Sequence, residues 1–193
     1  MKHLKLMAIA LSIVFATACK DNKKETETEM ETEVEKTVEE TVTKKELKID
    51  LESKSESNAA GSIKFTEENG KVKMMAYLSG LDEGEHAIHI HEEADCSSPD
   101  GTSAGGHWNP TGMPHGKWGA ETGYHKGDIG NFNVAADGKG EVEFSTDQWC
   151  IGCGDRSKDI LGKAIIVHQG ADDFTSQPSG AAGSRVSCGG IIE

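Results

Sequence analysis

The sequence predicts an all-β fold, a Greek-key β-sandwich or flattened barrel of about eight strands with two long functional loops. Short runs in which apolar and polar residues alternate recur from residue 47 to the C-terminus, as expected for strands with one buried face. Asn69-Gly70 and Asp137-Gly138 each separate two such runs and predict hairpin turns. The same part of the chain is rich in Gly and poor in helix-forming residues, which argues against a helical fold.

The predicted strands are joined by two long loops that carry most of the polar chemistry. One hairpin joins residues 61–68 to 71–80, and a second occupies residues 128–145. The long loops cover residues 92–126 and 169–184, and connections of this length in a compact domain are usually functional. The remaining strands are expected at residues 47–53, 85–92, 161–169 and 185–193.

Residues 1–18 have the features of a secretory signal peptide. Lys2 and Lys5 flank the start, and residues 6–18 form an apolar core that is too short to span a bilayer well. Small residues precede Cys19, which is typical of a bacterial lipoprotein cleavage site with Cys19 as the lipidated first residue. Ala16 stands where Leu or Val is commoner, so an ordinary signal peptide with an incidental Cys is the alternative.

Residues 19–46 are predicted to be a lipid-anchored, disordered acidic tether, which leaves residues 47–193 as one folded domain. Glu, Thr and Lys dominate the tether, and it has too few large apolar groups to offset the entropy of ordering. The alternative is a short charged helix, because Val34, Val38 and Val42 are spaced four apart. Neither interpretation gives the segment any chemistry.

The net charge of −13 limits the classes of partner. An acidic chain is repelled by nucleic acids and by anionic membrane surfaces. We therefore expect no nucleic-acid partner, and membrane attachment only through the N-terminal lipid.

Histidines are concentrated in one region of the sequence. His89 and His91 lie two apart in an alternating run, and because side chains on a strand alternate with a period of two, both imidazoles leave the same face. Further candidates follow on a Gly/Pro-rich stretch and at the end of another strand-like run: His107, His115, His125, Asp128 and His168. Imidazole suits copper and zinc, and zinc also accepts carboxylate oxygen. The set exceeds the needs of one tetrahedral ion, so two ions with a shared ligand are expected. For an isolated His, a residue without metal would be the better interpretation.

Five motifs in this order resemble the copper/zinc superoxide dismutase family. They are H-x-H at 89–91, GGHWNP at 105–110, HKGDIGN at 125–131, VHQGADD at 167–173 and GSRVSCGG at 183–190. The likeness covers roughly residues 47–193, and the N-terminal segment indicates the exported bacterial lipoprotein type. The resemblance implies an oxidoreductase that converts superoxide to oxygen and hydrogen peroxide by Cu(II)/Cu(I) cycling beside a His-bridged zinc.

The resemblance also assigns the two metals to named residues. Copper would be bound by His89, His91, His107 and His168. Zinc would be bound by His107, His115, His125 and Asp128. His107 would bridge the metals through its two ring nitrogens, and would take up and return a proton during the cycle. His86 lies on the opposite face of its strand from His89, and the resemblance gives it hydrogen bonds to backbone instead.

Two further residues acquire roles from the resemblance. Asp172 matches a carboxylate that links a copper-ligand His to a zinc-ligand His, here His89 and His115, with a capping or exposed Asp as the alternative. Arg185 matches the arginine beside the open copper position, where a guanidinium attracts and orients superoxide. The alternative for Arg185 is a surface residue that caps loop carbonyls.

Local positive charge matters here because the net charge of the chain repels an anion. The lysine that follows the copper-ligand His by two positions in the eukaryotic enzymes is Gly170 here. Lys117 and Lys126 are the remaining candidates for steering superoxide.

The cysteines divide into one lipid site and two pairs. Cys96 and Cys188 match the intrasubunit disulfide of the family, which would contribute roughly 4–5 kcal/mol in the chain-entropy model and is permitted in an exported protein. Cys150 and Cys153 form a C-x-x-C that the family pattern does not predict. We expect a short structural disulfide there, with a metal site or a redox pair as the alternatives.

The leading hypothesis is therefore a dismutase anchored as a lipoprotein outside the cytoplasm, in the periplasm or cell envelope. An extracytoplasmic copper-buffering or copper-delivery module of the same fold is the alternative. Lost ligands or a lost arginine would favour that alternative, and neither loss occurs in the sequence. A homodimer is compatible with the family, and the sequence does not specify it.

Overall fold

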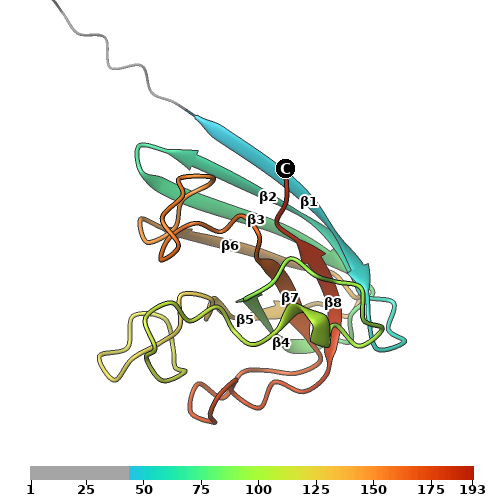
Figure 1. Cartoon of the computed structure of the whole chain (residues 1–193). Coiled ribbons are helices and arrows are strands. Elements are labelled where there is room, and N and C mark those ends of the chain that lie inside the picture. Colours follow the sequence, from blue (N-terminus) through green and yellow to red (C-terminus); the bar gives the residue numbers. More distant parts are fainter. Residues whose placement is uncertain (1–43) are drawn as a thin grey trace, which may run out of the picture. The chain divides into compact units, whose positions relative to one another are not determined.

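In a computed structural model, described for residues 44–193, the chain forms a closed barrel of antiparallel strands (Figure 1). The strands are β1 (Lys45–Ser53), β2 (Ala60–Glu68), β3 (Lys71–Ser79), β4 (Gly84–His91), β5 (Gly130–Val134), β6 (Gly140–Thr146), β7 (Ala164–His168) and β8 (Arg185–Gly190). Around the barrel the order is β1-β2-β3-β6-β5-β4-β7-β8. Strand β3 therefore neighbours β6 rather than β4, as in a Greek key. The predicted fold class is confirmed.

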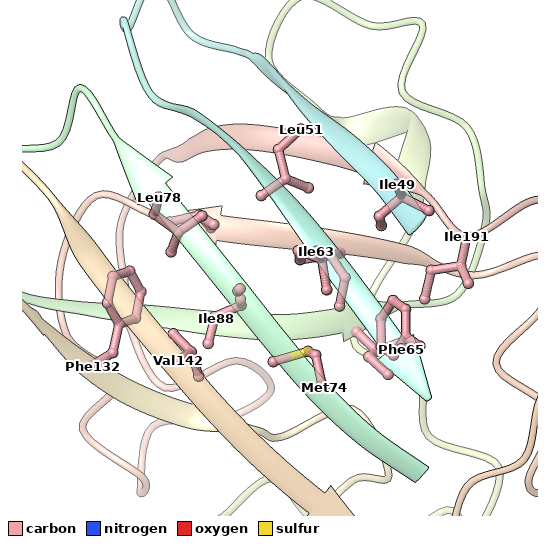
Figure 2. Packing of buried hydrophobic residues seen from close by; sticks show 14 of the residues in the cluster. Ile49, Leu51, Ile63, Phe65, Met74, Leu78, Ile88, Phe132, Val142 and Ile191 are labelled. Atoms are coloured by element: carbon pink, nitrogen blue, oxygen red, sulfur yellow. The ribbon is translucent and has the colours of Figure 1, made fainter. Parts of the chain in front are cut away.

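The barrel interior is filled by side chains from the inward faces of strands in which buried and exposed residues alternate. Burial in β3 alternates almost residue by residue, and the turn before it has φ of 52° at Asn69 and 71° at Gly70, which suits a tight hairpin. Figure 2 shows side chains from separate strands meeting inside the barrel, among them Phe65, Met74 and Ile88. Because this core packs against the inner faces of the strands, it holds the strand backbone in place for the side chains on the outer faces.

Strands β4 and β7 differ from the others because nearly every residue in them is buried. Ile88 and Ile90 of β4 belong to the interior core, so the residues between them, His89 and His91, leave the opposite face. On β7, Ile165 belongs to the interior core and Ile166 to a small outer cluster. The outer face of this part of the barrel is thus covered by loops, and the histidines lie between the loops and the sheet.

Three long connections leave the barrel. The first joins β4 to β5 through residues 92–129 and contains the short 3-10 helix η1 (Thr102–Ala104), and the second joins β7 to β8 through residues 169–184. Both were predicted. The third, residues 147–163 between β6 and β7, was not singled out. Its apolar residues Trp149, Ile151 and Ile160 pack on the core, so its composition does not resemble that of a solvated loop.

Strand β1 begins at Lys45, two residues before the predicted domain boundary at 47. The predicted signal peptide (1–18), the lipidation site Cys19 and the tether up to residue 43 lie outside the described residues. Within residues 44–193, no helix has the length and apolar character needed to cross a membrane.

Candidate metal centre

Two groups of buried ligand atoms meet on the outer face of the barrel. One consists of His89, His91, His107 and His168, and the other of His107, His115, His125 and Asp128. Within each group the ligand atoms lie within 4.8 Å of one another, so each could hold a metal ion. The structure thus brings together every predicted metal ligand, and His107 belongs to both groups.

The strands place three of these histidines. His89 and His91 share the outer face of β4, where they pair with Ile166 and Ala164 of β7. His168 ends β7 at an irregularity in its pairing with β8, between Val167 and His168. The backbone that carries these three imidazoles is therefore held by strand pairing and by the core beneath it.

Backbone contacts place the loop histidines beside β4. His107 forms an isolated bridge with His91, and Trp108 N–H donates to the carbonyl of Ile90 at 2.8 Å. Gly127 accepts from Ile90 N–H at 2.9 Å, and a Cβ at Gly127 would overlap the Ile90 backbone. Only Gly permits this close approach, which brings the neighbouring ligands His125 and Asp128 onto the strand.

His107 lies between the two groups and presents one ring nitrogen to each. Its ring centroid is 4.0 Å from that of His89 on one side, and 5.3 Å from that of His115 on the other. Its Nδ1 lies 2.9 Å from Asp128 Oδ1, whereas its Nε2 is buried without a hydrogen-bond partner. This orientation is the one a bridging ligand requires.

Six buried ring nitrogens have no hydrogen-bond partner among the described residues. They are His89 Nδ1, His91 Nε2, His107 Nε2, His168 Nε2, His115 Nδ1 and His125 Nδ1. His115 Nδ1 lies 3.0 Å from Asp128 Oδ2, yet the angle is wrong for a hydrogen bond, as expected when lone pairs point to a common position. A buried polar atom without a partner costs about 1–3 kcal/mol. Metal ions would satisfy all six atoms, so the residues fit copper and zinc.

The other nitrogens of these rings are held by acceptors. His91 Nδ1 donates to Gly105 O at 3.0 Å, and His168 Nδ1 lies 3.5 Å from Gly183 O. Because a carbonyl only accepts, the proton of His91 is on Nδ1 and the lone pair of Nε2 faces the cluster. Such contacts fix the tautomer and ring orientation of a metal ligand.

The carboxylate of Asp172 contacts one histidine of each ligand group, as predicted. Its Oδ2 lies 3.0 Å from His89 Nε2, and its Oδ1 lies 2.9 Å from His115 Nε2. Asn131 on β5 fixes the aspartate by accepting from Asp172 N–H and donating to its carbonyl. Gly180 passes so close that a Cβ there would overlap the carboxylate. The exposed alternative is excluded by burial, since Asp172 is only 3% exposed, whereas Oδ1 also accepts from Phe174 N–H at 2.7 Å, so the side chain caps the loop as well.

The electrostatics separate the two groups. Burial lowers the pKa of His91 and His168 well below 6.5, and the neighbouring imidazoles lower both further. Burial also lowers the pKa of His107 to about 4, despite its contact with Asp128. At His115, burial acts in the same direction, but Asp128 and Asp172 outweigh it and raise the pKa to about 9.

Burial raises the pKa of Asp128, but its contacts with His107, His115 and His125 outweigh burial and lower it far below 3.8. The first group therefore consists of imidazoles alone, three of them with a lowered pKa, and the second contains a carboxylate. Copper accepts the first set, and zinc takes mixed nitrogen and oxygen ligands.

A cavity of about 460 Å³ opens onto the first group. Its lining includes His91, His107, His168 and Arg185. The guanidinium of Arg185 donates to Gly101 O and Gly105 O, each at 2.8 Å. The guanidinium therefore holds two loop carbonyls and lies on the lining of the cavity, where the predicted role toward superoxide would require it; that role stays a prediction.

The two lysines considered for steering do not line this cavity. Lys126 Nζ lies 3.4 Å from Gln148 O, and Lys117 lies over the ring of Phe174. The sequence analysis missed Glu92 and Asn109, which do line it. Glu92 directly follows the H-x-H motif, so its position next to His91 was the available signal.

Gln177 is another residue that the sequence analysis missed. Its side-chain amide accepts from His115 N–H and donates to His115 O, both at 2.9 Å. His86 is bonded to backbone as expected, with Nδ1 3.0 Å from His168 O and Nε2 2.9 Å from Asp82 O. No local pattern points to Gln177, because its partner lies 62 residues away.

Both predicted disulfides are present. Cys96–Cys188 ties the first loop to β8, close to Arg185 in sequence, and closes a separation of 92 residues. Cys150–Cys153 closes a separation of 3 residues. In the chain-entropy model so short a ring contributes only about 2 kcal/mol, so its presence calls for a further explanation.

Comparisons with known proteins agree with this geometry. The family profile "Copper/zinc superoxide dismutase (SODC)" matches residues 59–191. Superoxide dismutase [Cu-Zn] 2 of Aquifex aeolicus is 36% identical over 142 residues, which cover 71% of this chain and 81% of the relative. An extracellular superoxide dismutase [Cu-Zn] of Caenorhabditis elegans is 34% identical over 144 residues, covering 72% and 63% respectively.

Among solved structures, the chain is similar to a double mutant of a SOD-like protein from Bacillus subtilis. The TM-score is 0.68 at 34% identity, and the match covers 76% of this chain and 97% of that protein. The fold of this chain is thus a known architecture.

Proposed function

Because the chain belongs to the copper/zinc superoxide dismutase family, we propose that it disproportionates superoxide to oxygen and hydrogen peroxide with bound copper and zinc. The observation that carries this proposal is the arrangement around His107, whose two ring nitrogens face two separate groups of buried ligand atoms. A protein that only stored copper would not need a histidine shared with a second, carboxylate-containing group.

Bound copper would supply the one-electron exchange with superoxide, and the chain supplies position, charge and a proton. His107 Nε2 is the atom at which we place the proton. Nε2 is buried without a hydrogen-bond partner, whereas Nδ1 contacts Asp128 Oδ1. An imidazole at this position can act as general acid and general base toward the substrate.

Arg185 would attract and orient the anionic substrate. The chain carries a net charge of −13, so bulk electrostatics oppose the approach of superoxide. The guanidinium is held by two carbonyls at the cavity, where solvent screening is weaker than at the open surface. A fixed positive charge at this place focuses the field on the copper side.

We place the protein outside the cytoplasm. Two disulfides are consistent with an oxidising compartment, and one relative is named an extracellular enzyme. The proposed anchor is a lipid on Cys19, joined to the barrel by an acidic tether that ends where β1 begins at Lys45. Superoxide is the substrate, and a homodimer remains part of the proposal.

Metal reconstitution tests the function. The full chain, stripped by a chelator, is loaded with zinc alone or with copper and zinc, and superoxide decay is followed by stopped flow with excess chelator present to suppress free copper. We expect buffer-level decay with zinc alone, and second-order decay approaching about 10⁸–10⁹ M⁻¹ s⁻¹ with both metals. Stoichiometric metal without faster decay would instead favour the copper-buffering module.

Neutralising Arg185 tests the substrate role. Arg185→Gln is expected to lower the rate constant for superoxide decay by about tenfold, because steering contributes about 10–10³ in such sites. The matched control is Arg156→Gln, which makes the same change in net charge at an exposed position lining a different cavity. Equal rates for the two variants, at equal metal content, would rule out a local role of Arg185.

A further inference from the structure

The connection between β6 and β7 contains a third group of converging ligand atoms. The sulfurs of Cys150 and Cys153 and a carboxylate oxygen of Asp159 all lie within 4.8 Å of one another. None of these residues contributes to the copper and zinc groups. The C-x-x-C spacing is one that zinc sites commonly use.

The loop holds this shape through contacts other than the disulfide. Cys150 N–H donates to Lys158 O at 2.9 Å, and Ile160 N–H donates to Cys150 O at 3.1 Å. The next residue, Ile151, is fixed to the barrel: its N–H donates to Glu67 Oε2 at 2.9 Å, and its carbonyl accepts from Lys45 Nζ at 2.6 Å. Opening the S–S bond would therefore leave the backbone of Cys150 in place.

Asp159 is oriented toward the cysteine turn by the backbone. Its Oδ1 accepts from Gly152 N–H at 2.9 Å and from Leu161 N–H at 3.1 Å, and its Oδ2 accepts from Gly154 N–H at 2.8 Å. Both glycines have positive φ, 62° and 75°, which turns the chain around the carboxylate. Oδ2 receives one bond where Oδ1 receives two, so it retains capacity to bind a cation.

Exposure and charge suit an ion that arrives from solvent. Cys150 is buried, whereas Cys153 is exposed. A cavity of about 440 Å³ adjoins the turn and is lined by Asp159 together with Arg156 and Lys163. Two thiolates and a carboxylate carry three negative charges, and Glu93 on the same cavity adds a fourth; a divalent ion together with Arg156 and Lys163 would balance them.

We propose that reduction of the Cys150–Cys153 disulfide creates a third metal site, in which both sulfurs and Asp159 bind a zinc-class divalent cation. The opening step takes two electrons and two protons from an external dithiol, which itself closes to a disulfide, and yields two thiols. Zinc then displaces the two thiol protons. In the oxidised state the sulfurs are bonded to each other and the site cannot form, so occupancy reports the redox state. The inference is independent of dismutase activity.

Zinc-edge X-ray absorption on the full chain gives a direct test. The chain is loaded with copper and zinc, reduced with a phosphine, exposed to zinc ion alone and freed of excess. Every candidate ligand of the main centre is nitrogen or oxygen, so sulfur scattering near 2.3 Å must come from cysteine. We expect a third equivalent of metal with two sulfur neighbours in the reduced chain, and neither in the oxidised chain.

Two variants decide which residues are responsible. The double variant Cys150→Ser/Cys153→Ser should lose both the third equivalent and the sulfur signal while it keeps the main centre. Asp159→Asn should weaken zinc binding to the reduced chain by about tenfold or more, whereas Asp155→Asn, an exposed neighbour in the same loop that caps Ser157, should not. The proposal is overturned if only two equivalents bind, if sulfur scattering persists in the double variant, or if the two aspartate variants bind zinc equally.

Discussion

Replacing His107 with Ala is expected to lower the rate constant for superoxide decay at least about 100-fold, since a positioned proton donor alone contributes about 10²–10⁴. His107 is the one residue that both groups share. The variant removes a nitrogen from each group, leaves Asp128 Oδ1 without its contact at 2.9 Å, and takes away the proton site at Nε2. Stopped-flow decay at matched copper content measures the effect.

Zinc binding provides a second readout for His107→Ala. Loss of one of four ligands should weaken zinc, which a competing metallochromic chelator can quantify. The control is Thr111→Ala, which removes only an exposed hydroxyl bonded to Asn109 in the same loop and should match the parent in both measurements. Parent-like activity with His107→Ala would exclude a bridging role and the proposed mechanism with it.

Much of this centre could be predicted because its residues lie on regular strands or in distinctive motifs. The period of two along β4 placed His89 and His91 on one face, and the interior packing of Ile88 and Ile90 confirms it. Alternation and turn dipeptides were enough to predict the barrel. The pairing of Asp172 with His89 and His115 followed from resemblance, since no periodicity connects residues 83 and 57 positions apart.

The parts that could not be predicted depend on contacts between loops. The two-sided orientation of His107 arises from the bridge between its backbone and His91, and from Gly127 lying against Ile90. The connection 147–163 was not predicted as a long loop, because it contains apolar residues, such as the buried Trp149 and Ile160, that are unusual in a solvated loop. In both places tertiary packing decides where side chains point, and local sequence carries little of that information.

Asp172→Asn is expected to weaken both zinc and copper by about 10–100-fold, the usual cost of losing an outer partner of a ligating histidine. The two carboxylate oxygens receive His89 Nε2–H and His115 Nε2–H from opposite sides. An amide has only one oxygen, so its NH₂ group would face one of these donors. One imidazole must then turn or change tautomer, and the lone pair that it presents to the metal is lost.

Asp173→Asn is the matched control, because it makes the same chemical change at the adjacent residue. Asp173 is exposed, and its Oδ1 accepts from the backbone N–H groups of Thr175 and Ser176, which an Asn oxygen can also do. A 10–100-fold loss of metal affinity at each of the two sites lowers the free energy of unfolding of the metal-loaded protein by about 3–5 kcal/mol. For a domain of this size, that lowers the unfolding midpoint of the metal-loaded protein by about 6–20 °C.

The unloaded proteins separate a metal effect from a structural one. If Asp172 acts through His89 and His115, the unfolding midpoints of Asp172→Asn and Asp173→Asn should differ widely in the metal-loaded state and much less in the metal-free state. An equal difference in both states would mean that the Asp172 side chain only holds the loop through Phe174, whose N–H donates to Oδ1 at 2.7 Å. Because one carboxylate contacts a ligand of each group, the copper and zinc affinities should fall together in the same variant.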